Sequence, residues 1–199
     1  MAEENRPLLE HLARVQALLA REREEAVRLC EELLALPREQ QAEAVRSDPR
    51  FRTWGICESL LLQSADPRIA PAAEERRALL ALQAAAVLDR LVHAAAVVRD
   101  LQAWAWGCVS RARLRADDMD GPDGAERALT EAAAHLAHGT GDLLVEARLL
   151  EREAMLRHRQ GHPREAAALL RQAEARYREI GENGLADLAR STRDRLLAV

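Results

Sequence analysis

Two amphipathic stretches on either side of a Gly-His-Pro turn constrain the fold of this chain most. Apolar side chains recur three and four residues apart in 143–160 and again in 163–180, which is the period of an α-helix with one buried face. Gly161 suits the left-handed position after a helix, and Pro163 suits the first turn of the next, where its missing N–H would have no partner. The sequence therefore predicts two antiparallel helices joined by a tight turn.

A second copy of this pattern predicts that helical hairpins stack on one another. The spacing Ala-x3-Leu-x2-Ala begins at Ala125 and again at Ala166. Small residues at such offsets let a second helix nest closely against a first. A single hairpin of this length cannot bury its apolar stripe alone, so neighbouring copies must cover it.

In the register set by the turn glycine, residues 97–181 resemble the tetratricopeptide repeat (TPR) family, whose period is about 34 residues. Leu150 falls at the family's first large position and Ala154 at its small one, whereas Glu153 and Arg157 stand where the family prefers Leu and Tyr. The resemblance implies an all-α, TPR-like superhelix of antiparallel helix hairpins. It also implies a concave groove that binds a protein or peptide partner, and it brings no catalytic residue.

The chain is expected to form a single all-helical domain over residues 1–199. Residues 1–67 would form an N-terminal helical extension, 68–181 the TPR-like helix pairs, and 182–199 a C-terminal capping helix. The capping helix is expected because its apolar side chains lie on one side and its charged side chains on the other, as the end of a repeat stack requires.

The sequence leaves two helix boundaries undetermined. Residues 7–35 predict one long amphipathic helix, or two helices broken near 21–25, where all five residues are charged. No Gly or Pro separates the helical runs 71–91 and 92–116. Because a single helix of that combined length is unusual in a globular domain, we place a boundary near 91–94.

The basic residues exclude several chemistries, because all 29 of them are arginine. A chain without lysine has no phosphate-loop lysine, no Schiff base and no lysine general base. It also lacks a Gly-rich phosphate loop, and its Ser, Cys and carboxylate residues stand in no recognisable catalytic arrangement. We therefore expect no enzymatic activity and no cofactor. The formal net charge is −4 and neither half has a basic excess, so we expect no nucleic-acid partner.

Cysteine usage and the N-terminus predict a cytoplasmic protein. Cys30, Cys57 and Cys108 are far apart in apolar helical contexts, which is typical of buried thiols in a reducing compartment. The N-terminus lacks a basic segment followed by an apolar run, and no stretch is apolar for long enough to cross a bilayer. We expect no membrane partner.

The acidic segment 117–124 could suggest calcium binding. An EF-hand needs an oxygen ligand at its fifth position and Gly at its sixth, but a loop beginning at Asp118 places Pro122 and Asp123 there. The simpler interpretation is a connection between helices, with Asp123 capping the second helix. We therefore expect no metal at this segment.

Two histidine pairs could each suggest a zinc ligand set. His135 and His138 lie near the end of one helix, and His158 and His162 flank the turn at the far end of the next. That helix is about 27 Å long, so the two pairs cannot share one metal. We expect surface histidines that favour the helix dipole, and no metal site.

The register implied by the TPR resemblance also predicts the partner-binding side chains. The family's clamp for a C-terminal carboxylate uses Lys and Asn, and this chain has no Lys and only two Asn, both outside the groove, so that clamp is excluded. Gly107 would leave space beside a neighbouring indole. The predicted groove residues are Arg148, Glu151, Arg152, Met155, His158 and Arg159 on one helix, and Trp106, Ser110 and Arg113 on the helix before it.

This arginine-weighted set predicts a noncatalytic interaction scaffold that binds a peptide or protein partner, which we expect to be acidic or of mixed polarity. The alternative function is a regulatory or sensor subunit whose output lies on another chain. A structural alternative is that the arginines are merely solvated and that Trp106 belongs to the core. The oligomeric state and the identity of the partner stay open.

Overall fold

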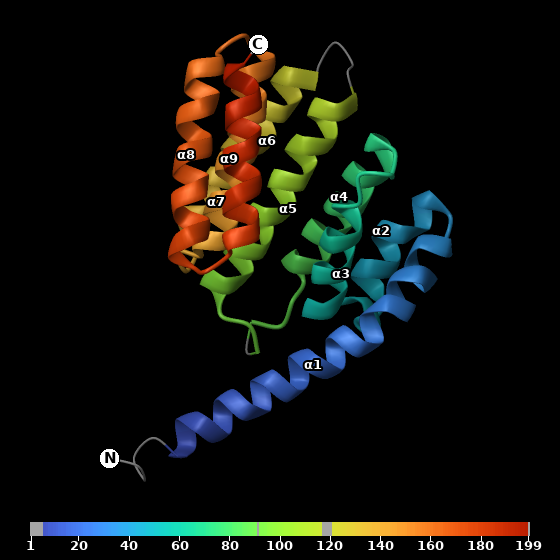
Figure 1. Cartoon of the computed structure of the whole chain (residues 1–199). Coiled ribbons are helices and arrows are strands. Elements are labelled where there is room, and N and C mark those ends of the chain that lie inside the picture. The colour runs from blue at the N-terminus through green and yellow to red at the C-terminus, as the bar shows by residue number, and fades with distance from the viewer. Residues whose placement is uncertain (1–5, 91, 117–120, 199) are drawn as a thin grey trace.

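The computed structural model describes residues 6–90, 92–116 and 121–198, and within these ranges it contains helices and no strand. From α3 onward, each helix packs against the next one along the chain (Figure 1). The predicted all-α array of antiparallel helix hairpins is therefore confirmed. The elements are α1 (Arg6–Ala35), α2 (Arg38–Ser47), the 3-10 turn η1 (Pro49–Phe51), α3 (Trp54–Ser64), α4 (Pro71–Ala86), α5 (Ala95–Ala116), α6 (Gly121–Leu136), α7 (Leu143–Arg159), α8 (Pro163–Glu179) and α9 (Asn183–Leu197).

The turn between α7 and α8 has the predicted form. Gly161 has φ +82°, and the backbone N–H of His162 donates to the carbonyl of Arg157 at 2.8 Å, which closes the end of α7. Pro163 is the first residue of α8. The turn after α8 repeats this geometry, with Gly181 at φ +80°. Glycine is favoured at both turns because a side chain at positive φ is strained.

The connection between α4 and α5 includes the predicted boundary at 91–94 but begins before it. α4 ends at Ala86 and α5 begins at Ala95, and the residues between them include neither Gly nor Pro. Leu88 in this connection is buried, and the His93 ring stacks on Trp54 with 5.7 Å between centroids. Packing of these side chains interrupts the helix, and local propensity alone did not indicate it.

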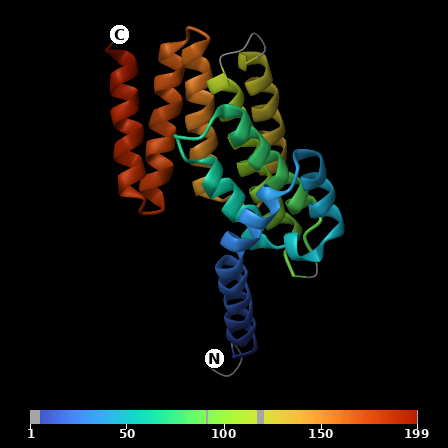
Figure 2. The ribbon, with the colours of Figure 1, turned by 90° about the vertical axis from the view of Figure 1, so that its right-hand side faces the viewer.

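Helix α1 is continuous from Arg6 to Ala35, so the alternative of a break near 21–25 is wrong. Its C-terminal part packs on α3, with Ala26, Leu29 and Leu33 buried. Its N-terminal part extends away from the other helices (Figures 1 and 2). The boundary expected at 67/68 falls in the connection between α3 and α4, which pack against each other.

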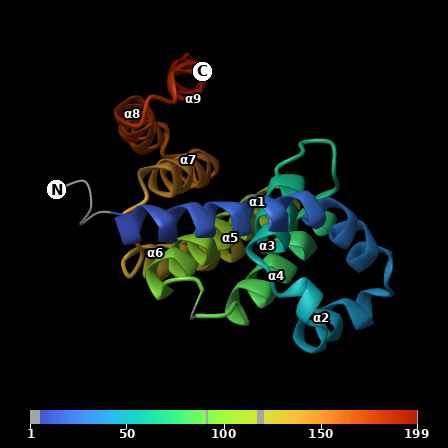
Figure 3. The same ribbon diagram turned by 90° about the horizontal axis from the view of Figure 1, so that it is seen from below.

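The core has one large part and several smaller ones. The large part runs from α1 to α6, whereas α7, α8 and α9 meet mainly through alanine. Ala147, Ala173, Ala186 and Ala189 have at most 1% of their surface exposed, so these helices approach closely. Figure 3 shows α7, α8 and α9 following one another away from α5. This arrangement leaves one face of α7 open toward α9.

Candidate functional site

A groove between α7, α8 and α9 brings together four of the side chains predicted to bind a partner. Its cavity has a volume of about 320 Å³. The α7 side chains in it recur three and four residues apart and so share one face of that helix. The α7–α9 groove is lined by Arg148, Glu151, Arg152 and Met155 of α7, Leu170 and Tyr177 of α8, and Leu185, Leu188 and Thr192 of α9.

Arg152 is the least compensated charge in the groove. Among the residues that the structure describes, its guanidinium has no ion-pair or hydrogen-bond partner. Burial, and then the neighbouring Arg111 guanidinium, lower the pKa of Arg152, because both disfavour the charged form. An anion placed beside Arg152 would relieve this cost.

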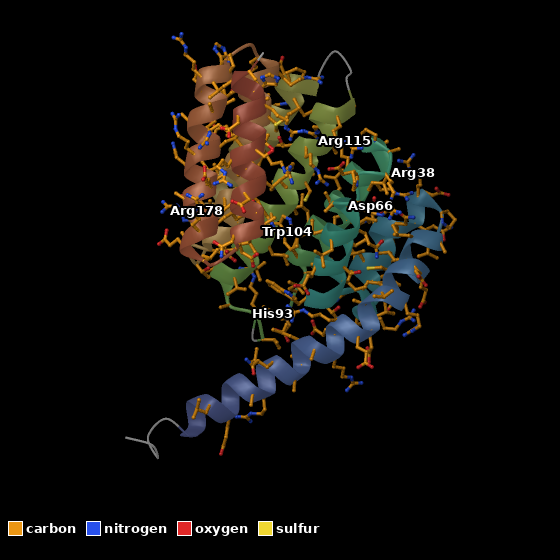
Figure 4. All side chains as sticks on the ribbon, in the orientation of Figure 1. Arg38, Asp66, His93, Trp104, Arg115 and Arg178 are labelled. Carbon is orange, nitrogen blue, oxygen red and sulfur yellow. The ribbon has the colours of Figure 1, made fainter. Side chains whose placement is uncertain are left out.

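Arg111 does not need such an anion, because its own charge is balanced. Its guanidinium donates to the fully buried carboxylate of Glu74 and to the carbonyl of Ser64, the latter at 2.6 Å. Arg115 donates to the other oxygen of Glu74. These contacts fix α5 to the start of α4 and hold Arg111 beside Arg152. Figure 4 shows Arg115 near the C-terminal end of α5.

Arg148 is held over an indole ring. Its central guanidinium carbon lies 4.6 Å from the centroid of the Trp104 ring on α5, within the range of a cation–π contact. Within the described part of the chain no carboxylate forms an ion pair with Arg148. Its N–H groups are therefore free of acidic partners, while the ring limits the positions that the side chain adopts.

Glu151 contributes a negative charge to the groove. The Tyr177 hydroxyl donates to Oε2 of Glu151 at 2.7 Å. Burial and the Glu151 charge raise the pKa of Tyr177, so its hydroxyl stays protonated and continues to donate. The Tyr177 side chain is almost fully buried, which fixes the position of the Glu151 carboxylate. The groove is thus of mixed polarity.

A second cavity adjoins the groove at Arg148. It has a volume of about 230 Å³, and Figure 4 labels Trp104 on α5, which lines it. Asp100 accepts hydrogen bonds from the Thr140 backbone N–H at 3.0 Å and from its hydroxyl at 2.5 Å, which fixes the α6–α7 connection as one wall. The Trp104 pocket is lined by Trp54, Glu58, Val97, Asp100, Leu101, Trp104, Thr140, Asp142, Leu144, Val145 and Arg148.

The three groove residues predicted on α5 lie elsewhere. Trp106 and Arg113 line a separate cavity of about 300 Å³ between α5 and α6. Arg113 donates to Glu75 at 2.8 Å and to the carbonyl of Gly124 at 3.1 Å, so it ties three helices together. Ser110 is buried, with 1% of its surface exposed.

Two predicted residues of α7 also lie outside the cavity. His158 and Arg159 belong to the last turn of the helix, and neither lines the groove. Nδ1 of His158 is buried and has no hydrogen-bond partner among the described residues. Gly107 does not make room for an indole: a Cβ there would lie 2.6 Å from Cδ2 of Leu149, so this glycine admits the α7 side chain.

Sequence reasoning missed Trp104 and Arg111, which face α7 on α5. The α5 register was displaced by two residues, because Trp104 and Arg111 are seven apart just as Trp106 and Arg113 are. The two pairs have the same residue types at the same spacing, so the pattern could not separate them. The contact of Gly107 with Leu149 decides which face of α5 meets α7.

A cavity of about 340 Å³ between α2 and α4 is an alternative site. Arg38 and Arg76 line it, and Nε of Arg76 is buried without a hydrogen-bond partner in the described ranges. Burial and the Arg38 charge lower the pKa of Arg76. This cavity has two cationic side chains but no aromatic side chain.

Neither pattern considered for metal binding forms a cluster in the part of the chain that the structure describes. No group of three or more His, Cys, Asp or Glu side chains there could hold an ion. His135 accepts a hydrogen bond from Arg99 at 3.0 Å through Nδ1. In the acidic segment, 117–120 lies outside the described residues and Asp123 lies in the first turn of α6.

The three cysteines, Cys30, Cys57 and Cys108, are free and buried. Across the described residues, none of the helices combines the length and apolar character that crossing a membrane requires. Comparisons of the chain with models of known protein families, with curated proteins and with solved structures find no match.

Proposed function

We propose that this protein is a noncatalytic, TPR-like scaffold that binds an acidic or mixed-polarity segment of a partner protein in the α7–α9 groove. The observation that carries the proposal is the pair Arg148 and Arg152. Both guanidinium groups border one cavity, and neither has a carboxylate partner among the described residues. Most arginines on the flanking helices α8 and α9, by contrast, have acidic or hydroxyl partners.

The chemistry of the groove specifies the partner further. Arginine pairs with carboxylates through two parallel hydrogen bonds, which fixes orientation as well as charge. Met155 and Leu188 offer apolar surface beside the two arginines, and Leu188 has 55% of its surface exposed. The Glu151 carboxylate disfavours a second acidic group of the partner close to it. We expect a segment with a carboxylate at Arg148 and Arg152 and an apolar side chain at Met155 or Leu188.

Binding of short fluorescent peptides tests the proposal directly. One peptide combines Glu and Leu, a second replaces every Glu by Gln, and a third replaces every Glu by Lys. Fluorescence polarisation is measured at low and at high salt. We expect only the Glu peptide to bind, and its affinity to fall with salt because ion pairs near the surface are screened.

Three matched charge reversals locate the site. Arg152→Glu is expected to weaken binding of the Glu peptide by at least about tenfold, which corresponds to about 1.4 kcal/mol. Arg171→Glu makes the same charge change at an exposed position of α8 outside the cavity, and binding should hardly change. Arg76→Glu tests the cavity between α2 and α4. Loss of binding in Arg76→Glu with normal binding in Arg152→Glu would refute the groove.

The alternative function, a regulatory or sensor subunit, uses the same groove. A regulatory subunit changes the activity of its bound partner, whereas a scaffold does not. Measuring the partner's activity with and without this chain therefore separates the two functions. We also propose a cytoplasmic location, supported by the free and buried Cys30, Cys57 and Cys108, because such thiols persist in reducing compartments.

A further inference from the structure

The cavity between α2 and α4 is bordered by two arginines that no acidic side chain balances. Its volume is about 340 Å³, and Arg38 of α2 and Arg76 of α4 both line it. Among the described residues, neither guanidinium forms an ion pair or a hydrogen bond. Figure 4 labels Arg38, the first residue of α2. An anion in this cavity would supply the missing counter-charge.

The positive charge of Arg76 is costly where it lies. Burial lowers its pKa first, and the Arg38 and Arg77 guanidinium charges lower it further, since each disfavours the charged form. Of the described side chains that line the cavity, only Glu75 is acidic. Its carboxylate accepts a hydrogen bond from Arg113 of α5 at 2.8 Å. Glu75 is therefore already engaged, and the cavity keeps an excess of positive charge.

Two glutamine side chains that line the same cavity each have a buried oxygen without a donor. Gln41 of α2 has 1% of its surface exposed, and its Nε2 donates to the carbonyls of Leu36 at 2.9 Å and Leu34 at 3.3 Å. These two bonds orient the amide and leave its Oε1 without a partner in the described ranges. Oε1 of Gln83 on α4 is buried without a partner there as well. Because buried acceptors in proteins normally have a donor, an occupant of this cavity should carry donors as well as negative charge.

The remaining wall of the cavity is mostly apolar and includes Leu79 and Leu80. Nε of Arg76 is a third buried atom without a partner. The side chains of Arg76 and Gln83 are only partly buried, so rotations about their terminal bonds can turn these polar groups toward a ligand. Apolar walls with a few polar groups are typical of small-molecule pockets, whose volumes are about 300–1,000 Å³.

We propose that the cavity between α2 and α4 binds a small phosphate monoester whose organic part carries hydroxyl or amino donors, such as a sugar phosphate or a nucleoside monophosphate. A phosphate monoester has about two negative charges near neutral pH and three acceptor oxygens, so it can pair with Arg38 and Arg76 together. A single carboxylate would balance only one of them. The donors of the organic part would supply the partners that Gln41 and Gln83 lack.

This site does not depend on the α7–α9 groove, because none of the side chains that line it belongs to α7, α8 or α9. It therefore stands or falls separately from the proposed binding of a partner segment. If the chain acts as a regulatory or sensor subunit, a phosphorylated metabolite bound between α2 and α4 would be its input signal.

Isothermal titration calorimetry of the full chain tests the ligand class. The probes are a panel of sugar phosphates and nucleoside monophosphates, together with inorganic phosphate and unphosphorylated glucose. We expect at least one monoester to bind at least about tenfold more tightly than inorganic phosphate, because its organic part adds hydrogen bonds to the two glutamines. Glucose should not bind. Absence of binding across the whole panel, or equal affinity for inorganic phosphate and for every monoester, would overturn the proposal.

Two charge-removing variants locate the site. Arg38→Gln and Arg76→Gln should each weaken binding of the tightest monoester by at least about tenfold, because each removes one of the two cations that face the phosphate. Arg38 is exposed, so its replacement should leave the fold intact even if Arg76→Gln is unstable. Arg171→Gln removes the same charge at an exposed position of α8 outside the cavity and should bind like the wild type. Normal binding by folded Arg38→Gln would contradict the inference.

Two further titrations separate this site from the groove and from a phosphorylated protein partner. Arg152→Glu should bind the monoester like the wild type, and Arg76→Gln should bind the Glu-containing peptide like the wild type. Loss of monoester binding in Arg152→Glu but not in Arg76→Gln would place the phosphate in the α7–α9 groove and overturn the inference. A phosphoserine peptide should bind more weakly than the tightest monoester, and a peptide that binds more tightly than every monoester would also overturn it.

Discussion

The guanidinium of Arg148 lies over the ring of Trp104, with 4.6 Å between its central carbon and the ring centroid. This contact joins α7 to α5, and because Arg148 lines both cavities, it also joins the α7–α9 groove to the Trp104 pocket. A cation–π contact restrains the side chain without using its N–H donors. In the function proposed above, this contact would hold Arg148 in place while its N–H groups stay available to a carboxylate of the partner.

The first prediction concerns this restraint. Trp104→Ala should weaken binding of the Glu-containing peptide by about two- to fivefold, since an exposed cation–π contact is worth about 0.5–1 kcal/mol. Trp104→Phe should lose less, because a ring remains under the guanidinium. Polarisation titrations of the folded variants give the readout.

Trp106→Ala is the matched control, because Trp106 lies on the same helix but lines the cavity between α5 and α6. Peptide binding by that variant should equal the wild type. If Trp106→Ala weakens binding and Trp104→Ala does not, the partner uses the face of α5 that the sequence register first indicated.

A second prediction concerns the buried carboxylate of Glu74, which holds Arg111 and Arg115 at once. Glu74→Ala should lower the free energy of unfolding by about 3–5 kcal/mol, because it leaves two partly buried cations without their common partner. Chemical denaturation monitored by circular dichroism measures the loss.

The comparison is Glu43→Ala, which removes an exposed ion pair with Arg46 within one helix. Its expected cost is below about 1 kcal/mol. Equal stabilities for Glu74→Ala and Glu43→Ala would show that the Glu74 network does not hold α5 to α4.

The third prediction uses two glycines in opposite surroundings. Gly55→Ala should destabilise the protein by about 1–3 kcal/mol, because the new Cβ meets the rigid backbone of Glu22 and pushes α3 from α1. Gly184→Ala should stabilise by up to about 1 kcal/mol, since nothing lies within 4 Å of its Cβ position and alanine favours a helix. Melting temperatures that move in the same direction would contradict this interpretation of the α1–α3 contact.

Local signals explain which parts of the fold could be predicted from the sequence. The turn at Gly161 and Pro163 was predictable because both residues have strong backbone preferences that act within a few positions. The end of α4 at Ala86 was not, since it depends on Leu88 and on the stacking of His93 against Trp54. Trp54 comes from a distant part of the chain, so no local sequence pattern indicates that it stacks on His93.

The candidate site was also predictable where local signals act and not where packing between helices decides. Arg148 and Arg152 both line the groove. Their position on one face of α7 follows from the helical period, and the adjacent turn at Gly161 sets the register of that helix. Tyr177 and the α9 side chains were missed, because the predicted groove was limited to the first helix of each pair. On α5 the register depends on which face meets Leu149, and that is a property of packing between helices.

The last prediction concerns acid sensitivity through His135. Burial and the Arg99 charge lower the pKa of His135 below its ordinary 6.5, and Arg99 donates to its unprotonated Nδ1 at 3.0 Å. Protonation therefore occurs more readily in the unfolded chain, so stability is lost as the pH falls from about 6.5 through the lower folded pKa. The carboxylate of Glu131 raises the pKa of His135 and the His138 ring lowers it, so these two smaller effects oppose each other. His135→Gln should reduce the fall in melting temperature between about pH 7.5 and pH 5.5, whereas His138→Gln, at an exposed position, should retain it. If His135→Gln and the wild type lose the same stability over this range, the Arg99 contact does not keep His135 neutral in the folded protein.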